Sequence, residues 1–467
     1  MNPFNFRDKI ITLIFFLSFL TWNEPIFSQS DVWQTGVARV DITPTDSLWL
    51  AGYAIRDHIV EGTLHKLWAK ALAIKDENGK QCVLITTDLL GLPKNISDNI
   101  RLQCKKKYHL ERSQIILSSS HTHSGPVLRE SLYNVYPLTS DQIEKINRYS
   151  DQLEKQIIDL IGQALENMVP SQLYSNNGVV RFQVNRRNND ASELTVQTQL
   201  NGPNDYAVPV LEVRKTDGDL FATAFGYACH PTVLDSYQWS GDYPGFSQLS
   251  LEEKYPDVTA LFFQGCGADQ NPLPRRSLSL AEQYGQELAI AVERVIEDES
   301  DPIQSDLITG YSEVELYFSS PPSKQTLERI SKDTTVVYYQ KWAKQMLGKI
   351  KESEPLPTSY PYPVQIWKLG NQTIIALGGE VVIDYAIELK RIFGEDIFVM
   401  SYCNDVMGYI PSLRVLREGG YEGAGSQIVY DLPGTWQADI EVRIINEVIK
   451  LAQEMGLKIP KSKLFPK

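Results

Sequence analysis

Residues 115–126 read IILSSSHTHSGP, in which a short apolar run leads into three serines and a pair of histidines, His121 and His123. Such a run is typical of a buried β-strand, and Ser124-Gly125-Pro126 predicts a sharp turn directly after it. Side chains two positions apart on a strand point to the same face. We therefore expect both imidazoles to face one cavity at the end of this strand. Taken alone, the motif fits a hydrogen-bonded structural pair of histidines equally well.

Five other short apolar runs also end in polar residues or glycine. They cover residues 82–87, 222–228, 260–263, 373–377 and 397–402. Long amphipathic segments lie between the runs, at about 143–165, after a capping box of Ser279 and Glu282, and at 440–455. This alternation predicts an α/β (mixed α+β) fold, in which mixed β-sheets are flanked by helices.

The beginning of the chain resembles a secretory signal peptide, which we assign to residues 1–28. Arg7 and Lys9 precede an apolar run at 10–20, and small or polar residues follow it. The run is shorter than the roughly 20 residues that a membrane-spanning helix needs, although an uncleaved membrane anchor is the alternative. We expect the mature protein to be secreted or periplasmic.

The rest of the chain is expected to form a single domain over residues 30–467. Within it, we expect residues 319–357 to be a helical insertion or lid.

Composition limits the classes of partner. The formal net charge is −13 and 42% of residues are hydrophobic, so the chain is globular, and its acidic surface disfavours nucleic acid and anionic lipid. At most peripheral membrane contact is expected. The five cysteines lack a CxxC spacing, which argues against a cysteine zinc cluster and favours buried free thiols.

Two further run-ends carry residues that could bind a metal. His230 lies between Cys229 and Pro231, and Glu380 follows the run at 373–377. Burying a carboxylate costs free energy unless a cation or a hydrogen-bond donor lies next to it. Imidazole and carboxylate groups together form an ordinary ligand set for zinc. The alternatives are that His230 is a hydrogen-bonded structural histidine and that Glu380 is a carboxylate at the start of a helix. The chain has no HExxH or GxSxG motif and no phosphate-binding glycine loop, so the common peptidase, α/β-hydrolase and nucleotide-binding interpretations lose their main support.

Several motifs, in order along the chain, resemble those of one family, the neutral/alkaline ceramidases. The motifs are Gly36-Val37-Ala38-Arg39-Val40-Asp41-Ile42-Thr43-Pro44 with Ala51-Gly52-Tyr53-Ala54, Ser120-His121-Thr122-His123-Ser124-Gly125-Pro126, Tyr227-Ala228-Cys229-His230-Pro231, Gly378-Gly379-Glu380, Tyr409-Ile410-Pro411 and Tyr421-Glu422-Gly423-Ala424. The resemblance implies the fold of the family's catalytic domain and hydrolysis of the N-acyl amide bond of ceramide or a related lipid or small N-acyl compound.

The resemblance also implies roles for individual residues. Zn²⁺ would be held by four ligands: His121, His230, Glu380 and Tyr409. His123 would be the general acid/base, and Tyr421 and Arg186 would stabilise the tetrahedral intermediate, with Arg187 as a close rival to Arg186. The implied reaction is attack of a metal-activated water on the amide carbonyl.

The chain departs from the family pattern in two places. Where the family loop has a serine, this chain has Asn271, which cannot act as a nucleophile but can donate to an oxyanion. The chain is also expected to lack the immunoglobulin-like domain that follows in full-length members. These departures keep two alternatives open: a zinc hydrolase of another amide or ester, and a catalytically inactive binding protein that retains the fold.

Overall fold

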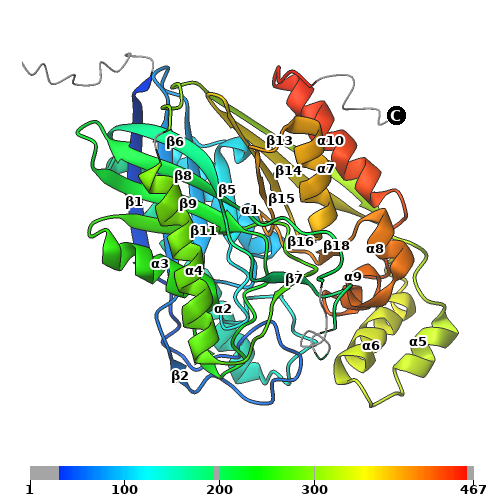
Figure 1. Ribbon diagram of the computed structural model, residues 1–467. Coiled ribbons are helices and arrows are strands. Elements are labelled where there is room, and N and C mark those ends of the chain that lie inside the picture. Colours follow the sequence, from blue (N-terminus) through cyan, green and yellow to red (C-terminus); the bar gives the residue numbers. More distant parts are fainter. Residues whose placement is uncertain (1–30, 191, 193–198, 299, 460–467) are drawn as a thin grey trace, which may run out of the picture.

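The computed structural model describes residues 31–190, 192, 199–298 and 300–459 (Figure 1). The predicted signal peptide, 1–28, lies outside the described residues. The larger sheet has the strand order β11-β9-β8-β6-β1-β3-β4-β5. Its strands are β1 (Trp33–Asp41), β3 (Trp68–Lys75), β4 (Gln81–Thr87), β5 (Ile115–Ser119), β6 (Val169–Val179), β8 (Ala207–Lys215), β9 (Leu220–Tyr227) and β11 (Thr259–Gln264).

A smaller sheet has the order β13-β14-β15-β17. Its strands are β13 (Leu307–Tyr317), β14 (Ser359–Leu369), β15 (Gln372–Leu377) and β17 (Phe398–Met400). Three two-stranded ribbons complete the strands: β2 (Gly62–Thr63) with β10 (Gln238–Trp239), β7 (Gln183–Asn185) with β12 (Gln270–Pro272), and β16 (Glu380–Val381) with β18 (Tyr409–Ile410). Both large sheets are mixed, because β9/β11, β4/β5 and β15/β17 are parallel and the other pairs are antiparallel. The predicted mixed α/β class is confirmed, and all six apolar runs are strands.

Several helices cover the outer faces of the two sheets, and a pair of helices within 324–351 packs on itself beside them (Figure 1). They are α1 (Lys94–Tyr108), α2 (Ser140–Glu166), α3 (Asp242–Lys254), α4 (Leu278–Glu297), α5 (Lys324–Ile330), α6 (Val337–Lys351), α7 (Ile383–Phe393), α8 (Leu413–Glu418), α9 (Gly420–Gly423) and α10 (Ile440–Glu454), with the short 3₁₀ turns η2 (Arg112–Gln114) and η3 (Gly425–Ile428).

Alternation along the strands produces this layered core. On β3, Ala69 and Ala71 face the core shared with α1 and α2, whereas Leu72 and Ile74 face the core that lies between the two sheets. The opposite side of the smaller sheet packs against α7 and α10. Since side chains point alternately to the two faces of a strand, each sheet is apolar on both sides. That pattern explains why the runs read as almost continuous apolar sequence.

The carboxyl ends of several strands meet where the two sheets join. Isolated bridges connect Ser118, in β5, to Cys403, and Gly265, just after β11, to Met400 in β17. The two edge strands of the larger sheet therefore both approach the end of β17. Polar residues that follow these strands are gathered at one place, as expected for a sheet with parallel edges.

Several local expectations need correction or refinement. Helix α4 begins at Leu278 and is capped by Ser277, whose side chain accepts from the Leu280 N–H, so the predicted capping box at Ser279 is two residues too late. Segment 319–357 contains two helices, α5 and α6, rather than one. All five cysteines are buried free thiols, as predicted.

Core packing between the sheets gives a testable expectation. Ile74 is 1% exposed and lies between the sheets, whereas Ile290 on α4 is 52% exposed. We expect Ile74→Ala to lower the free energy of unfolding by about 2–5 kcal/mol, because it leaves a cavity. The matched change Ile290→Ala should alter that free energy by less than about 0.5 kcal/mol. Urea denaturation followed by circular dichroism measures both; equal effects would contradict a packed interface between the sheets.

Candidate active site and metal centre

His121 lies in the loop after β5 and is fully buried, with a left-handed backbone (φ 65°). Its Nδ1 lies 2.6 Å from the Leu90 carbonyl oxygen, to which it donates. The proton is therefore on Nδ1, and the Nε2 atom presents a lone pair. The strand alternation that we expected for His121 and His123 is wrong, because neither residue is in a strand. The two rings nevertheless come together, because their nitrogens and those of His230 lie within 4.8 Å of one another.

His230 follows β9 and has the same arrangement. Its Nδ1 lies 2.7 Å from the Gly267 carbonyl oxygen, and its Nε2 points toward the other histidines. Burial, together with the nearby Arg186 guanidinium, lowers the pKa of His230 to about 4. The ring is therefore neutral at pH 7, and Nε2 carries a lone pair rather than a proton.

Glu380 and Tyr409 enter the site from the parallel ribbon β16/β18, in which they are register partners. The Glu380 Oε2 atom lies 3.2 Å from His121 Nε2 and 3.3 Å from His230 Nε2. The Tyr409 hydroxyl lies 3.4 Å from His230 Nε2. Tyr430 donates to the other carboxylate oxygen, Oε1. Glu380 Oε2 is buried and has no hydrogen-bond donor among the described residues.

These atoms fit a tetrahedral cation. The Nε2 atoms of His121 and His230 both face the Glu380 Oε2 atom across 3.2–3.3 Å, while their Nδ1 atoms lie against backbone carbonyl groups. A positive ion between these three atoms would stabilise the buried carboxylate. Zinc–nitrogen bonds of about 2.0–2.1 Å place neighbouring tetrahedral ligand atoms about 3.3 Å apart. His121, His230 and Glu380 have the chemistry and the spacing for such a site, with the Tyr409 hydroxyl 3.4 Å from His230 Nε2. The ring nitrogens of His121, His123 and His230 also lie within 4.8 Å of one another and could hold a metal ion.

His123 completes the cluster. Its Nε2 lies 3.3 Å from His121 Nε2, and burial, followed by the neighbouring His121 and His230, lowers its pKa well below the usual range. The Tyr53 ring packs on it with centroids 4.6 Å apart. Gly52, at φ 102°, also supports the ring, because a Cβ added there would lie 2.5 Å from the His123 imidazole.

Arg186 connects the cluster to its surroundings. Its Nη2 donates to the Tyr409 hydroxyl at 3.0 Å, its Nη1 donates to Asn271 Oδ1 at 3.3 Å, and its Nε pairs with Glu422 at 2.7 Å. Tyr421 lies next to Tyr409, with ring centroids 5.3 Å apart, and is 47% exposed. All eight residues predicted for the site are thus brought together. Arg187 pairs instead with Glu418 and Glu422, so Arg186 is the arginine that contacts the cluster.

Sequence reasoning missed several supporting residues. Glu422 belongs to a motif that we quoted for its tyrosine, whereas Tyr430 lies in no motif and nothing in the sequence marks it. The carbonyl groups of Leu90 and Gly267 could not be found from residue types. Asp242, which could have oriented a histidine, instead accepts from the backbone N–H groups of 233, 234 and 243 and fixes the turn after His230.

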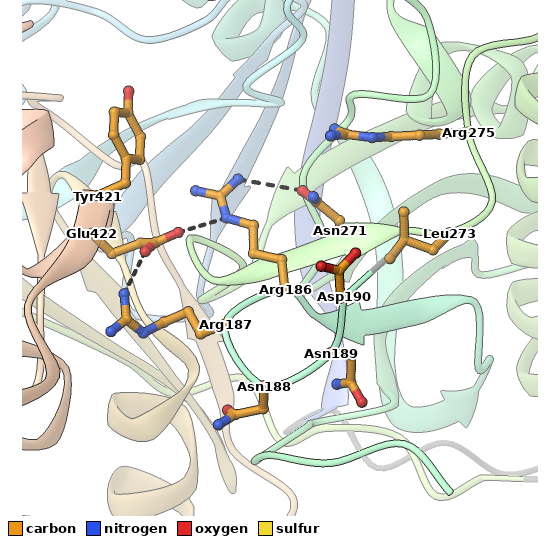
Figure 2. A pocket seen from close by; sticks show the side chains of 10 residues that line it. All are labelled: Arg186, Arg187, Asn188, Asn189, Asp190, Asn271, Leu273, Arg275, Tyr421 and Glu422. Atoms are coloured by element: carbon orange, nitrogen blue, oxygen red, sulfur yellow. Dashed lines mark hydrogen bonds and ion pairs between the residues drawn. The ribbon is translucent and has the colours of Figure 1, made fainter. Parts of the chain in front are cut away.

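A cavity of about 670 Å³ opens beside the cluster (Figure 2). Arg186, Asn271, Tyr421 and Glu422 form part of its wall, so the cavity shares residues with the candidate site. Figure 2 shows Glu422 between the two guanidinium groups of Arg186 and Arg187, and Asn271 facing Arg186. A substrate in this cavity would lie against the groups that border the metal centre.

Comparisons with known proteins place the chain in a family. Residues 33–274, more than half of the chain, match the family model described as "Neutral/alkaline non-lysosomal ceramidase, N-terminal". Neutral ceramidase of Drosophila melanogaster is 24% identical over 255 residues, which are 51% of this chain and 35% of that protein. Neutral ceramidase 1 of Arabidopsis thaliana is 25% identical over 57% of this chain and 35% of its own length. The chain thus spans about a third of these curated relatives.

Solved structures extend the likeness of the fold. The crystal structure of neutral ceramidase from Pseudomonas aeruginosa matches 92% of this chain and 75% of that one, with a TM-score of 0.71 and 16% identity. A structure titled "Ceramidase complexed with C2" matches 93% of this chain and 77% of that one, also with a TM-score of 0.71 and 16% identity. The predicted ceramidase-like fold is confirmed, and the chain belongs to the neutral/alkaline non-lysosomal ceramidase family.

Proposed function

We propose that this chain is a zinc-dependent hydrolase that cleaves the N-acyl amide bond of ceramide or of a related N-acyl compound. One observation carries the proposal: the Nε2 atoms of His121 and His230 converge on the Glu380 carboxylate in a buried site, while their Nδ1 atoms lie against backbone carbonyl groups. Family membership supports the amide substrate. The groups around the cluster match those that amide hydrolysis needs.

Bound zinc would supply a Lewis acid that lowers the pKa of a coordinated water to about 7. The chain's own residues would do the remaining work. His123, neutral because of its low pKa, accepts the proton of the water that adds to the acyl carbon. It then returns that proton to the amine nitrogen as the carbon–nitrogen bond breaks.

Two groups face the position where negative charge develops on the carbonyl oxygen. Arg186 is held by Glu422, Asn271 and Tyr409, so its guanidinium does not need to reorganise during the reaction. Tyr421, beside Tyr409, presents its hydroxyl from the partly exposed side. Asn271 uses its Oδ1 to hold Arg186, which leaves its Nδ2 group as a further donor.

Asn271 also favours a second candidate function. An amide side chain cannot be a nucleophile, so a mechanism that relies on a serine at this position is not available to this chain. A zinc hydrolase of another amide or ester fits the same geometry. An inactive binding protein would bind zinc without hydrolysing any member of an amide and ester panel.

We further propose that residues 30–467 work as one domain and that residues 1–28 direct export. Among the described helices, none combines the length and the apolar character needed to cross a membrane. The site assigned here lies wholly within the proposed domain.

Loss of a ligand should remove the metal. We expect His230→Ala to reduce bound zinc from about one equivalent to a small fraction, because structural and catalytic sites of this kind depend on each imidazole. Mass spectrometry of the purified protein measures the metal. The exposed His58 offers a matched control, and His58→Ala should keep its zinc. Equal zinc contents in the two variants would contradict the assigned centre.

His123 separates proton transfer from metal binding. We expect His123→Ala to retain zinc but to lower kcat by about 10²–10⁴-fold, the range typical of a general acid/base. Zinc content and turnover of a fluorescent short-chain ceramide or another N-acyl amide are measured on the same preparation. Loss of zinc in this variant would make His123 a ligand instead.

Tyr421 gives a test of oxyanion stabilisation. Removal of one donor of this kind typically costs about 10²–10³-fold in kcat, and we expect that loss for Tyr421→Phe with zinc content unchanged. Tyr317 on β13, 38% exposed, is the matched control, and Tyr317→Phe should leave kcat unchanged. A normal kcat for Tyr421→Phe would exclude the hydroxyl from the reaction.

A further inference from the structure

The cavity beside the candidate metal-binding cluster is lined mainly by residues with polar or charged side chains. Three of its lining residues are arginines (Arg186, Arg187 and Arg275), and most of the others are amides or carboxylates. Leu273 and Tyr421 are the only apolar or aromatic side chains among the described residues that line it (Figure 2). An alkyl chain placed there would desolvate charged groups without offering them partners. The lining instead fits a polar or charged part of a substrate.

The arginines of this cavity are not equivalent. Arg186 and Arg187 share the carboxylate of Glu422, and Arg187 also pairs with Glu418. Arg275 has no carboxylate partner within the part of the chain that the structure describes; its one hydrogen bond runs from Nη1 to the Thr232 hydroxyl at 3.2 Å. Asp235 is the carboxylate whose charge acts on Arg275, but it pairs with Arg276 at 3.5 Å. The half-buried Arg275 guanidinium therefore has no ion pair of its own among the described residues.

The two carboxylates that line the cavity differ, because Glu422 pairs with arginines whereas Asp190 makes no ion pair among the described residues. Glu422 is occupied by the two arginines, and Asp190 accepts from the N–H and hydroxyl of Ser192. Burial lowers the pKa of Arg275, and the neighbouring Arg276 and Arg186 lower it further. An anion brought next to Arg275 would relieve this repulsion. Figure 2 shows the Arg275 side chain extending toward the part of the pocket that Arg186 and Asn271 border.

Arg275 is also close to the proton-transfer side of the site. Thr232, which it contacts, is two residues beyond His230 and donates its N–H to the His230 carbonyl. Tyr53, whose hydroxyl lies 3.5 Å from the Thr232 carbonyl oxygen, packs its ring on His123. Since His123 is the group assigned to the leaving amine, the part of the substrate that meets Arg275 belongs to the amine.

We infer that the substrate carries an anionic group, a carboxylate or sulfonate, on its amine portion, and that Arg275 binds this group. The inference rests on the proposed amide hydrolysis and narrows its substrate class from neutral ceramides to N-acyl compounds of acidic amines. Arg275 is then the specificity-determining residue, and the adjacent Asn271 and Arg186 face the amide itself.

The test compares matched substrates. N-octanoylglycine and N-octanoylethanolamine share the acyl chain and the amide, and differ in a carboxylate against a neutral hydroxymethyl group. We expect the zinc-loaded protein to have a kcat/KM at least about tenfold higher for the glycine compound. Arg275→Gln should remove this preference, lowering kcat/KM for the anion about tenfold and leaving the neutral substrate unchanged. Arg181, which is exposed and lies against the Tyr206 ring, is the control, and Arg181→Gln should leave both values unchanged.

A binding measurement keeps the two proposals separate. The corresponding octylsulfonyl amides of glycine and ethanolamine cannot be hydrolysed at an acyl carbon, and calorimetry on the zinc-loaded protein gives their affinities. Tighter binding of the glycine compound, lost in Arg275→Gln, supports the anion site even if no amide is hydrolysed, an outcome that would instead overturn the proposed activity. Equal affinities and equal kcat/KM values for the two members of each pair would overturn the anion site and leave the hydrolase in place.

Discussion

The candidate site depends on two backbone carbonyl groups. By accepting the Nδ1 protons of His121 and His230, the carbonyls of Leu90 and Gly267 force both lone pairs onto Nε2. Both Nε2 atoms are thereby directed at one buried carboxylate oxygen, at 3.2 and 3.3 Å, where a bound cation would stabilise all three atoms. The arrangement of the strands holds these two nitrogen atoms and the carboxylate oxygen in place.

That architecture brings together segments far apart in the chain. Leu90 and His121 follow the parallel strands β4 and β5, His230 and Gly267 follow the parallel strands β9 and β11, and Glu380 follows β15. Each histidine thus receives its backbone acceptor from the strand next to its own. Parallel neighbours end at the same edge of a sheet, so this pairing is a direct consequence of topology. The bridges from Ser118 and Gly265 to the segment around β17 then bring the two edges to the same place.

The sequence allowed much of this to be predicted, because apolar runs and the residues at their ends are local features. The six strands and the gathering of His121, His230 and Glu380 follow from such features and from a family resemblance. The reason for the orientation of His123 was not predictable, since it depends on Gly52 and Tyr53, about 70 residues earlier. Tyr430 could not be predicted for the same reason, because its hydroxyl donates to Glu380 only once the fold brings the two residues together. The N-cap of helix α4 is Ser277 rather than the predicted Ser279. An error of two residues is typical when helix boundaries are predicted from short polar motifs.

Arg186 connects the candidate metal-binding cluster to the adjacent cavity. It donates to Tyr409 on one side and pairs with Glu422 on the other, and its charge is one of the causes that lower the pKa of His230. Glu422 in turn holds Arg187, so one carboxylate fixes two cations in the cavity wall. Arg275, by contrast, makes no ion pair among the described residues, and its one hydrogen bond goes to the Thr232 hydroxyl. The inferred anionic group of the substrate would give this guanidinium the direct partner that Arg186 and Arg187 already find in Glu422.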